Sequence, residues 1–132
     1  MTAAPTGEPR RSDTWLVAAV AALTRFSMVA WAYSRIPPVA DGTYYDTMAR
    51  RLADGHGYTW LWPDGTVTAA AHYPVGYPAL VSFGYRLFGA HPGIAMVEGA
   101  LLGAAGAAAI HAFAAQHARR SAALAAGLAF AL

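Results

Sequence analysis

One carboxylate stands where an apolar stretch of the chain ends. Asp41 follows two prolines that close an apolar run over residues 15–33. In a membrane, this position would place the carboxylate at the lipid–water interface, where it could take up a proton during a reaction. The same position is also typical of a helix N-cap, with Asp41 capping a helix that starts near Thr43. The local residues alone leave both roles open.

Three tyrosines lie on the same side of this apolar run. Tyr44 and Tyr45 follow the carboxylate directly, and Tyr77 precedes a second proline-initiated segment. Amphipathic rings prefer the headgroup level of a bilayer, so anchoring is one interpretation and contact with a substrate is the other. Tyr45 also lies on the apolar face of a predicted helix, so of the two side chains Tyr44 is the more available for contact with a substrate.

A histidine and an arginine complete the candidate set. His72 could orient an acceptor or, together with His56, help to bind a metal ion. Two histidines without a matched acid are a poor metal pattern, so a hydrogen-bonded loop histidine is favoured and no metal site is predicted. Arg25 lies within the apolar run, where a charge must face protein, water or a phosphate. We expect it to pair with Glu98, with phosphate contact as the alternative.

The elements that must position these residues are predicted to be membrane helices. The sequence predicts a disordered tail over 1–13, spans over 14–36 and 93–116, a connector over 117–120 and the start of a third span over 121–132. Nineteen residues, 15–33, rise roughly 28 Å along a helix, which is close to the hydrocarbon thickness of a bilayer.

The last twelve residues rise only about 18 Å, so we expect the chain to be a fragment of a longer protein. A cleavable signal peptide is the competing interpretation of the first span, but its apolar core would be shorter.

The segment between the two spans, residues 37–92, has a different character. Tyr45, Met48, Ala49 and Leu52 recur at helical spacing, which predicts an amphipathic interfacial helix over 43–54. A second short helix is predicted over 78–88, and the Pro-Asp-Gly turn between them favours a small hairpin. Within the second span, Gly99, Gly103 and Ala107 form a stripe of small residues that favours close helix packing.

The composition fits a membrane protein and excludes other classes. Of 132 residues, 57% are hydrophobic and 12% are charged, about half the charged fraction of soluble domains. A net charge of +2 with scattered arginines argues against a nucleic-acid partner. Cysteine is absent, which excludes disulfides and thiolate metal sites.

Four stretches of the chain, taken in order, resemble a known enzyme family. They are residues 40–45, 51–58, 72–80 and 86–89, which read ADGTYY, RLADGHGY, HYPVGYPAL and RLFG. In this order they are similar to the first extracytoplasmic loop of family 39-type glycosyltransferases, the protein-mannosyltransferase-like and aminoarabinose-transferase-like enzymes of the GT-C fold. The family's double proline is broken here, because Val75 follows Pro74.

The resemblance implies an all-α polytopic membrane protein with a GT-C-like bundle, multi-pass in the cell membrane, with a cytoplasmic amino terminus. It implies inverting transfer of a sugar from a polyprenyl-phosphate donor to an extracytoplasmic acceptor, which could be a protein, a lipid or a glycan. In that case Asp41 is the general base, and the substrate-binding residues are Tyr44, Tyr45, His72, Tyr77 and Arg25. No cofactor is implied, and a divalent metal stays open. The chain alone is expected to be inactive.

Two other classes of function are compatible with the sequence. A non-catalytic small membrane protein, either an accessory subunit or a degenerate remnant of such a transferase, is the main alternative. A piece of a transporter ranks last, because the polar residues gather in the loop rather than within the spans.

Overall fold

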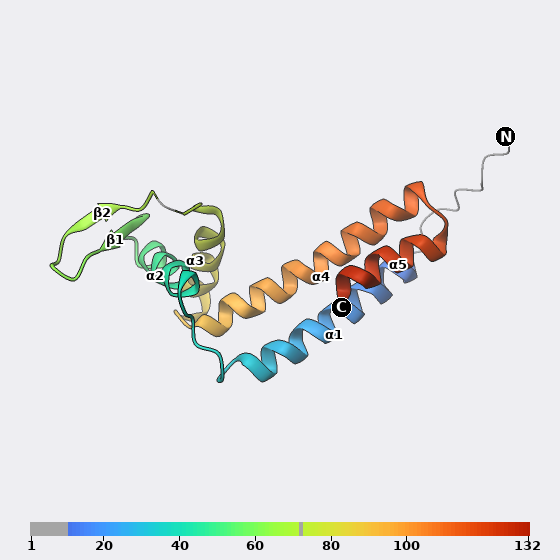
Figure 1. Cartoon of the computed structure of the whole chain (residues 1–132), viewed down its shortest axis with the longest axis horizontal. Coiled ribbons are helices and arrows are strands. Elements are labelled where there is room, and N and C mark those ends of the chain that lie inside the picture. Colours follow the sequence, from blue (N-terminus) through green and yellow to red (C-terminus); the bar gives the residue numbers. More distant parts are fainter. Residues whose placement is uncertain (1–10, 72) are drawn as a thin grey trace. The chain divides into compact units, whose positions relative to one another are not determined.

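The computed structural model describes residues 11–71 and 73–132 and is mostly helical. These described residues form five helices and one two-stranded sheet, whose order along the chain can be followed in Figure 1. Their bounds are α1 Arg11–Ala32, α2 Asp41–Ala53, β1 Thr59–Leu61, β2 Val67–Ala69, α3 Gly76–Phe88, α4 Pro92–His117 and α5 Arg120–Ala131. These elements form two compact units, one over residues 1–31 and 99–132 and the other over residues 32–98.

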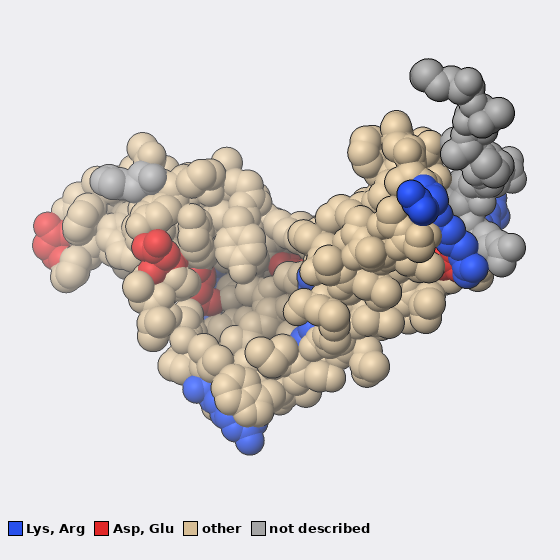
Figure 2. All heavy atoms as spheres, turned by 45° about the vertical axis from the view of Figure 1, so that its right-hand side comes forward, with Lys and Arg blue, Asp and Glu red and all other residues tan. Residues whose placement is uncertain are grey.

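Two helices, α1 and α4, are long and apolar enough to cross a membrane. Both leave large hydrophobic side chains exposed, among them Trp15 at 74%, Leu23 at 71% and Phe113 at 66%. Large exposed apolar surfaces mark sites of contact with a membrane or another protein. On the face drawn in Figure 2, charged groups occupy only small clusters. Among the described residues, α1 and α4 are therefore the two candidate membrane-spanning helices.

The first unit packs α1, the later part of α4, and α5 around small side chains. Its core consists of Val17, Ala21, Ala107 and Ala131, all buried. Small residues allow the helix backbones to approach closely, as the stripe on α4 predicted. The stripe is confirmed at Ala107 and at Gly103, whose added Cβ would overlap Arg25, but a Cβ at Gly99 would meet nothing.

Polar contacts join the helices of this first unit. Asp13 forms an ion pair with Arg120, from Oδ2 to Nε at 2.6 Å, and the side chains of Thr14 and His111 are hydrogen-bonded at 3.0 Å. These contacts place the partners of α1 on both α4 and α5. Of the tail predicted over 1–13, residues 11–13 belong to α1 and the others lie outside the described residues.

The second unit packs α2 against α3 and the first turns of α4, as Figure 1 shows for α2 and α3. Ala49, Val81 and Tyr85 form its buried core, with Ile94 and Ala95 packed against them. A Cβ at Gly84 would overlap Ile94 and Glu98, so glycine is what lets α3 approach α4 this closely.

The predicted hairpin is present in this second unit. β1 and β2 are antiparallel, with Trp60 opposite Thr68. At the turn, Gly65 has φ +86°, and the main-chain N–H of Thr66 donates to Oδ1 of Asp64 at 2.9 Å. Glycine and aspartate therefore act at the turn as the sequence pattern predicts.

Candidate functional site

The carboxylate at position 41 begins α2, and a strained turn precedes it. Ala40 has φ 48° and ψ −122°, and the main-chain N–H of Gly42 donates to the carbonyl of Val39 at 2.9 Å. This is the geometry of a type II′ turn with alanine where glycine is preferred. Backbone strain of this kind often occurs at functional sites, so the strain at Ala40 makes the next residue, Asp41, a candidate functional residue.

The N-cap interpretation of Asp41 is wrong. The N-cap residue is Ala40, with no side-chain cap bond, and Asp41 lies in the first turn, where the helix dipole favours its negative charge. Its Oδ1 instead accepts a hydrogen bond from the hydroxyl of Tyr73 at 2.8 Å. This contact leaves the helix and reaches the segment after the hairpin. The exposed carboxylate is thus held by a group 32 residues away.

The two neighbouring tyrosines of α2 face different surroundings. Tyr44 stacks on Trp60, with ring centroids 4.6 Å apart and planes within 7°. Tyr45 meets Tyr77 edge-on at 5.4 Å. The ring of Tyr73 contacts both, at 4.5 Å from Tyr44 and 5.3 Å from Tyr45. Tyr73 therefore joins the two sides of the helix at the carboxylate.

An apolar pocket lies on the Tyr45 side, and we call it the helix pocket. It holds about 300 Å³ and is lined by Ile36, Pro37, Pro38, Val39, Gly42, Tyr45, Asp46, Tyr77, Val81, Tyr85, Pro92, Ala95 and Met96. Most of this lining is hydrocarbon, with one carboxylate and three phenol rings as its polar members. Such a pocket suits a largely apolar group that carries a polar end.

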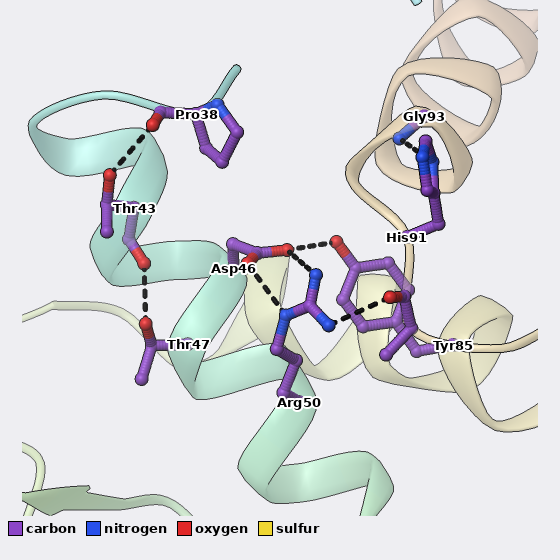
Figure 3. A network of polar contacts seen from close by, with 9 residues as sticks. Pro38, Thr43, Asp46, Thr47, Arg50, Tyr85, His91 and Gly93 are labelled. Atoms are coloured by element: carbon purple, nitrogen blue, oxygen red, sulfur yellow. Dashed lines mark hydrogen bonds and ion pairs between the residues drawn. The ribbon is translucent and has the colours of Figure 1, made fainter.

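A second carboxylate, Asp46, lies in this lining and belongs to the network drawn in Figure 3. It accepts a hydrogen bond from the hydroxyl of Tyr85 at 2.5 Å and pairs with Arg50, from Oδ2 to Nε at 2.8 Å. Arg50 also donates to the carbonyl of Ala90 at 2.8 Å. Of these contacts, the ion pair between Asp46 and Arg50 follows from local spacing, because the two residues lie at i,i+4 on one helix. No local sequence pattern indicates that Tyr85 contacts Asp46.

Burial and hydrogen bonding raise the pKa values of Tyr73, Tyr77 and Tyr85. Burial raises the pKa of Tyr85 above its ordinary value, and the hydrogen bond to Asp46 raises it further. The hydrogen bond to Asp41 raises the pKa of Tyr73. Burial raises the pKa of Tyr77. All three phenols stay protonated near neutral pH, so Tyr73 and Tyr85 act as donors to carboxylates.

The structure brings together four of the six predicted site residues. Asp41, Tyr44, Tyr45 and Tyr77 all lie in the second unit, around Tyr73. Tyr73 and the hairpin tryptophans were not predicted as site residues.

The other two predicted residues have different outcomes. Arg25 belongs to the first unit, where it donates to the carbonyls of Phe130 and Ala131, each at 2.8 Å. Its partner is therefore the main chain of α5 rather than the expected Glu98. His72 lies outside the described residues. Among the residues that the structure does describe, no group of three or more potential ligands could hold a metal ion.

Comparisons with protein-family models, curated proteins and solved structures find no match for this chain.

Proposed function

We propose that the chain is the amino-terminal part of a membrane glycosyltransferase that uses a polyprenyl-phosphate sugar donor. The observation that carries the proposal is the carboxylate of Asp41, which is exposed next to aromatic rings and lies nine residues after the last residue of a candidate membrane span, Ala32. A reaction of a lipid-linked sugar must occur at such a boundary, because the polyprenyl chain stays in the bilayer while the sugar and its phosphate lie at the water-facing surface. On this proposal, α1 and α4 cross the membrane and the second unit faces the extracytoplasmic side.

The proposed reaction is an inverting displacement. An acceptor hydroxyl oxygen forms a bond to the anomeric carbon while the bond from that carbon to the phosphate oxygen breaks. The electron pair leaves with the polyprenyl phosphate, and the proton of the hydroxyl passes to Asp41. The Tyr73 hydroxyl fixes the orientation of this carboxylate through Oδ1. In the part of the chain that the structure describes, no hydrogen bond is found at Oδ2, which is the oxygen that would take the proton.

The helix pocket supports the same proposal from the donor side. Its apolar walls suit the hydrocarbon next to the phosphate, and the phenols of Tyr45 and Tyr77 provide polar groups beside it. These walls come from α2, α3 and the start of α4 together. The pocket therefore requires the folded unit and not a single helix.

The test compares transfer by membranes that contain the chain expressed from its complete reading frame. The donors are polyprenyl-phosphate-linked mannose, glucose and aminoarabinose, and the readout is label transferred per amount of protein. We expect Asp41→Asn to lower transfer by about 10²- to 10⁴-fold with normal protein levels. Asp54→Asn is the matched control, because it removes the same charge at the other end of α2, where the residue is exposed.

Unchanged transfer in Asp41→Asn would remove this carboxylate from the mechanism. An absence of transfer by the wild-type protein with every donor would favour the non-catalytic accessory protein instead.

A further inference from the structure

The hairpin and α2 enclose a second concave site, which lies on the Tyr44 side of the carboxylate. We call it the hairpin cleft. It holds about 270 Å³ and is lined by Tyr44, Trp60, Trp62, Thr68, Ala69, Ala70 and Tyr73. It is separate from the helix pocket, since the two share no lining residue. The reaction as proposed above gives it no role.

The aromatic walls of this cleft are fixed by contacts across the hairpin. Trp62 stands edge-on to Trp60, with ring centroids 6.5 Å apart. Its indole N–H donates to the hydroxyl of Thr68 on the opposite strand at 3.0 Å. The main-chain carbonyl of Tyr73 accepts from Tyr58 at 2.8 Å. The rings are therefore held before any ligand arrives, which lowers the entropy lost on binding.

The lining carries hydroxyl groups and aromatic faces but no charged side chain. A charged ligand would therefore find no opposite charge in this lining. A fully apolar ligand would leave unused the remaining hydrogen-bonding capacity of the Thr68 and Tyr73 hydroxyls, which already bond Trp62 and Asp41. A pyranose ring matches the surface, because it presents C–H groups on its faces and hydroxyls around its rim. The cleft volume equals that of about nine waters at roughly 30 Å³ each, which is room for one such ring.

We propose that the hairpin cleft binds one neutral pyranose ring, stacked on the indole of Trp62. The cleft adjoins the carboxylate, because Tyr73 lines the cleft and donates to Asp41. Resting on the proposed function, the ring would belong either to the sugar of the lipid-linked donor or to a sugar unit of a glycan acceptor. Binding of the ring itself does not depend on transfer.

The direct test is tryptophan fluorescence of the full chain in phosphatidylcholine nanodiscs, which carry no sugar headgroups. The probes are the methyl pyranosides of glucose, mannose and galactose, and cellotetraose as a longer glycan. We expect a saturable change with at least one probe, and binding weakened about tenfold or more in Trp62→Ala. Trp62→Phe should recover part of the affinity. Trp15→Ala, which removes an exposed indole of the other unit, should bind as the wild type does.

The inference would be overturned by the absence of a saturable change with every probe, or by equal affinity in Trp62→Ala. Circular dichroism of each variant separates lost binding from lost folding. A proline-rich peptide that binds in place of the sugars would also contradict it, because it would show that the cleft recognises a peptide.

Transfer kinetics identify the source of the ring. If Trp62→Ala raises KM for the lipid-linked sugar alone, the ring is the donor's, and if it raises KM for the acceptor alone, the ring is the acceptor's. Sugar binding with no transfer by the wild-type protein would reject the proposed function and keep this inference. Transfer without sugar binding would do the reverse.

Discussion

The hydroxyl of Tyr85 on α3 donates to Oδ1 of Asp46 on α2, 39 residues earlier in the chain. Arg50 pairs with the same carboxylate and donates to the carbonyl of Ala90, so one carboxylate ties together α2, α3 and the segment that follows α3 (Figure 3). Tyr85 is 3% exposed, and its ring belongs to the core of this unit. This contact positions the helix that begins with Asp41.

Removing this hydroxyl should destabilise the second unit. We expect Tyr85→Phe to lower the free energy of unfolding by about 1.5–3 kcal/mol, because the lost hydrogen bond has a charged acceptor. Tyr58→Phe, which loses a hydroxyl bonded to a neutral carbonyl, should cost only about 0.5–1.5 kcal/mol. Thermal unfolding of the purified protein, followed by circular dichroism, measures both. Equal losses in the two variants would contradict the special role of the carboxylate.

The same phenol should make stability depend on alkaline pH. Burial and the hydrogen bond to Asp46 raise the pKa of Tyr85 in the folded state above the unfolded value of about 10. Its contribution is therefore complete below pH of about 10 and is lost as pH rises toward the folded pKa. Unfolding midpoints measured from pH 8 to 11 should fall less steeply in Tyr85→Phe than in the wild type. Identical slopes would exclude the effect.

Relieving the turn before Asp41 should stabilise the protein. Ala40 has φ 48°, so glycine at this position removes a steric cost of about 1 kcal/mol. We expect Ala40→Gly to raise the unfolding midpoint, against the usual direction for such a change. Ala53→Gly, at the end of α2 and packed on the core, should lower it. A lower midpoint in Ala40→Gly would show that the turn is not strained.

Two glycines of the first unit should respond in opposite ways to alanine. A Cβ at Gly127 would overlap His111 and Val17, so Gly127→Ala should cost about 1–3 kcal/mol. A Cβ at Gly99 would meet no neighbour, so Gly99→Ala should leave stability unchanged or raise it by up to about 1 kcal/mol. Unfolding of both variants in the same lipid checks the packing of α5. A neutral Gly127→Ala would contradict it.

The proposed orientation of the chain in the membrane can be measured with single-cysteine variants, because the chain has no cysteine of its own. We expect Asp64→Cys in the hairpin turn to react with a membrane-impermeant maleimide on intact cells. Ala118→Cys, between α4 and α5, should react only after the membrane is permeabilised. The reverse pattern would place Asp41 on the cytoplasmic side and end the transferase proposal.

Local patterns in the sequence determined the helices, the hairpin and the position of Asp41. The predicted helices over 43–54 and 78–88 correspond to α2 and α3, each beginning two residues earlier than expected. These features could be predicted because apolar spacing, the Pro-Asp-Gly turn and paired prolines each determine the structure of only a few neighbouring residues. The Asp46–Arg50 pair was readable for the same reason, since both residues lie on one helix face.

Only the tertiary structure decided what each carboxylate touches. Asp41 could cap a helix by its spacing, but the chain turned at Ala40 and brought Tyr73 within reach of the side chain. Arg25 likewise found carbonyls of α5 more than a hundred residues away. Hydrogen bonds of this kind depend on which helices pack together, and helix packing is set by contacts such as Gly84 against Ile94 that leave no periodic pattern in the chain.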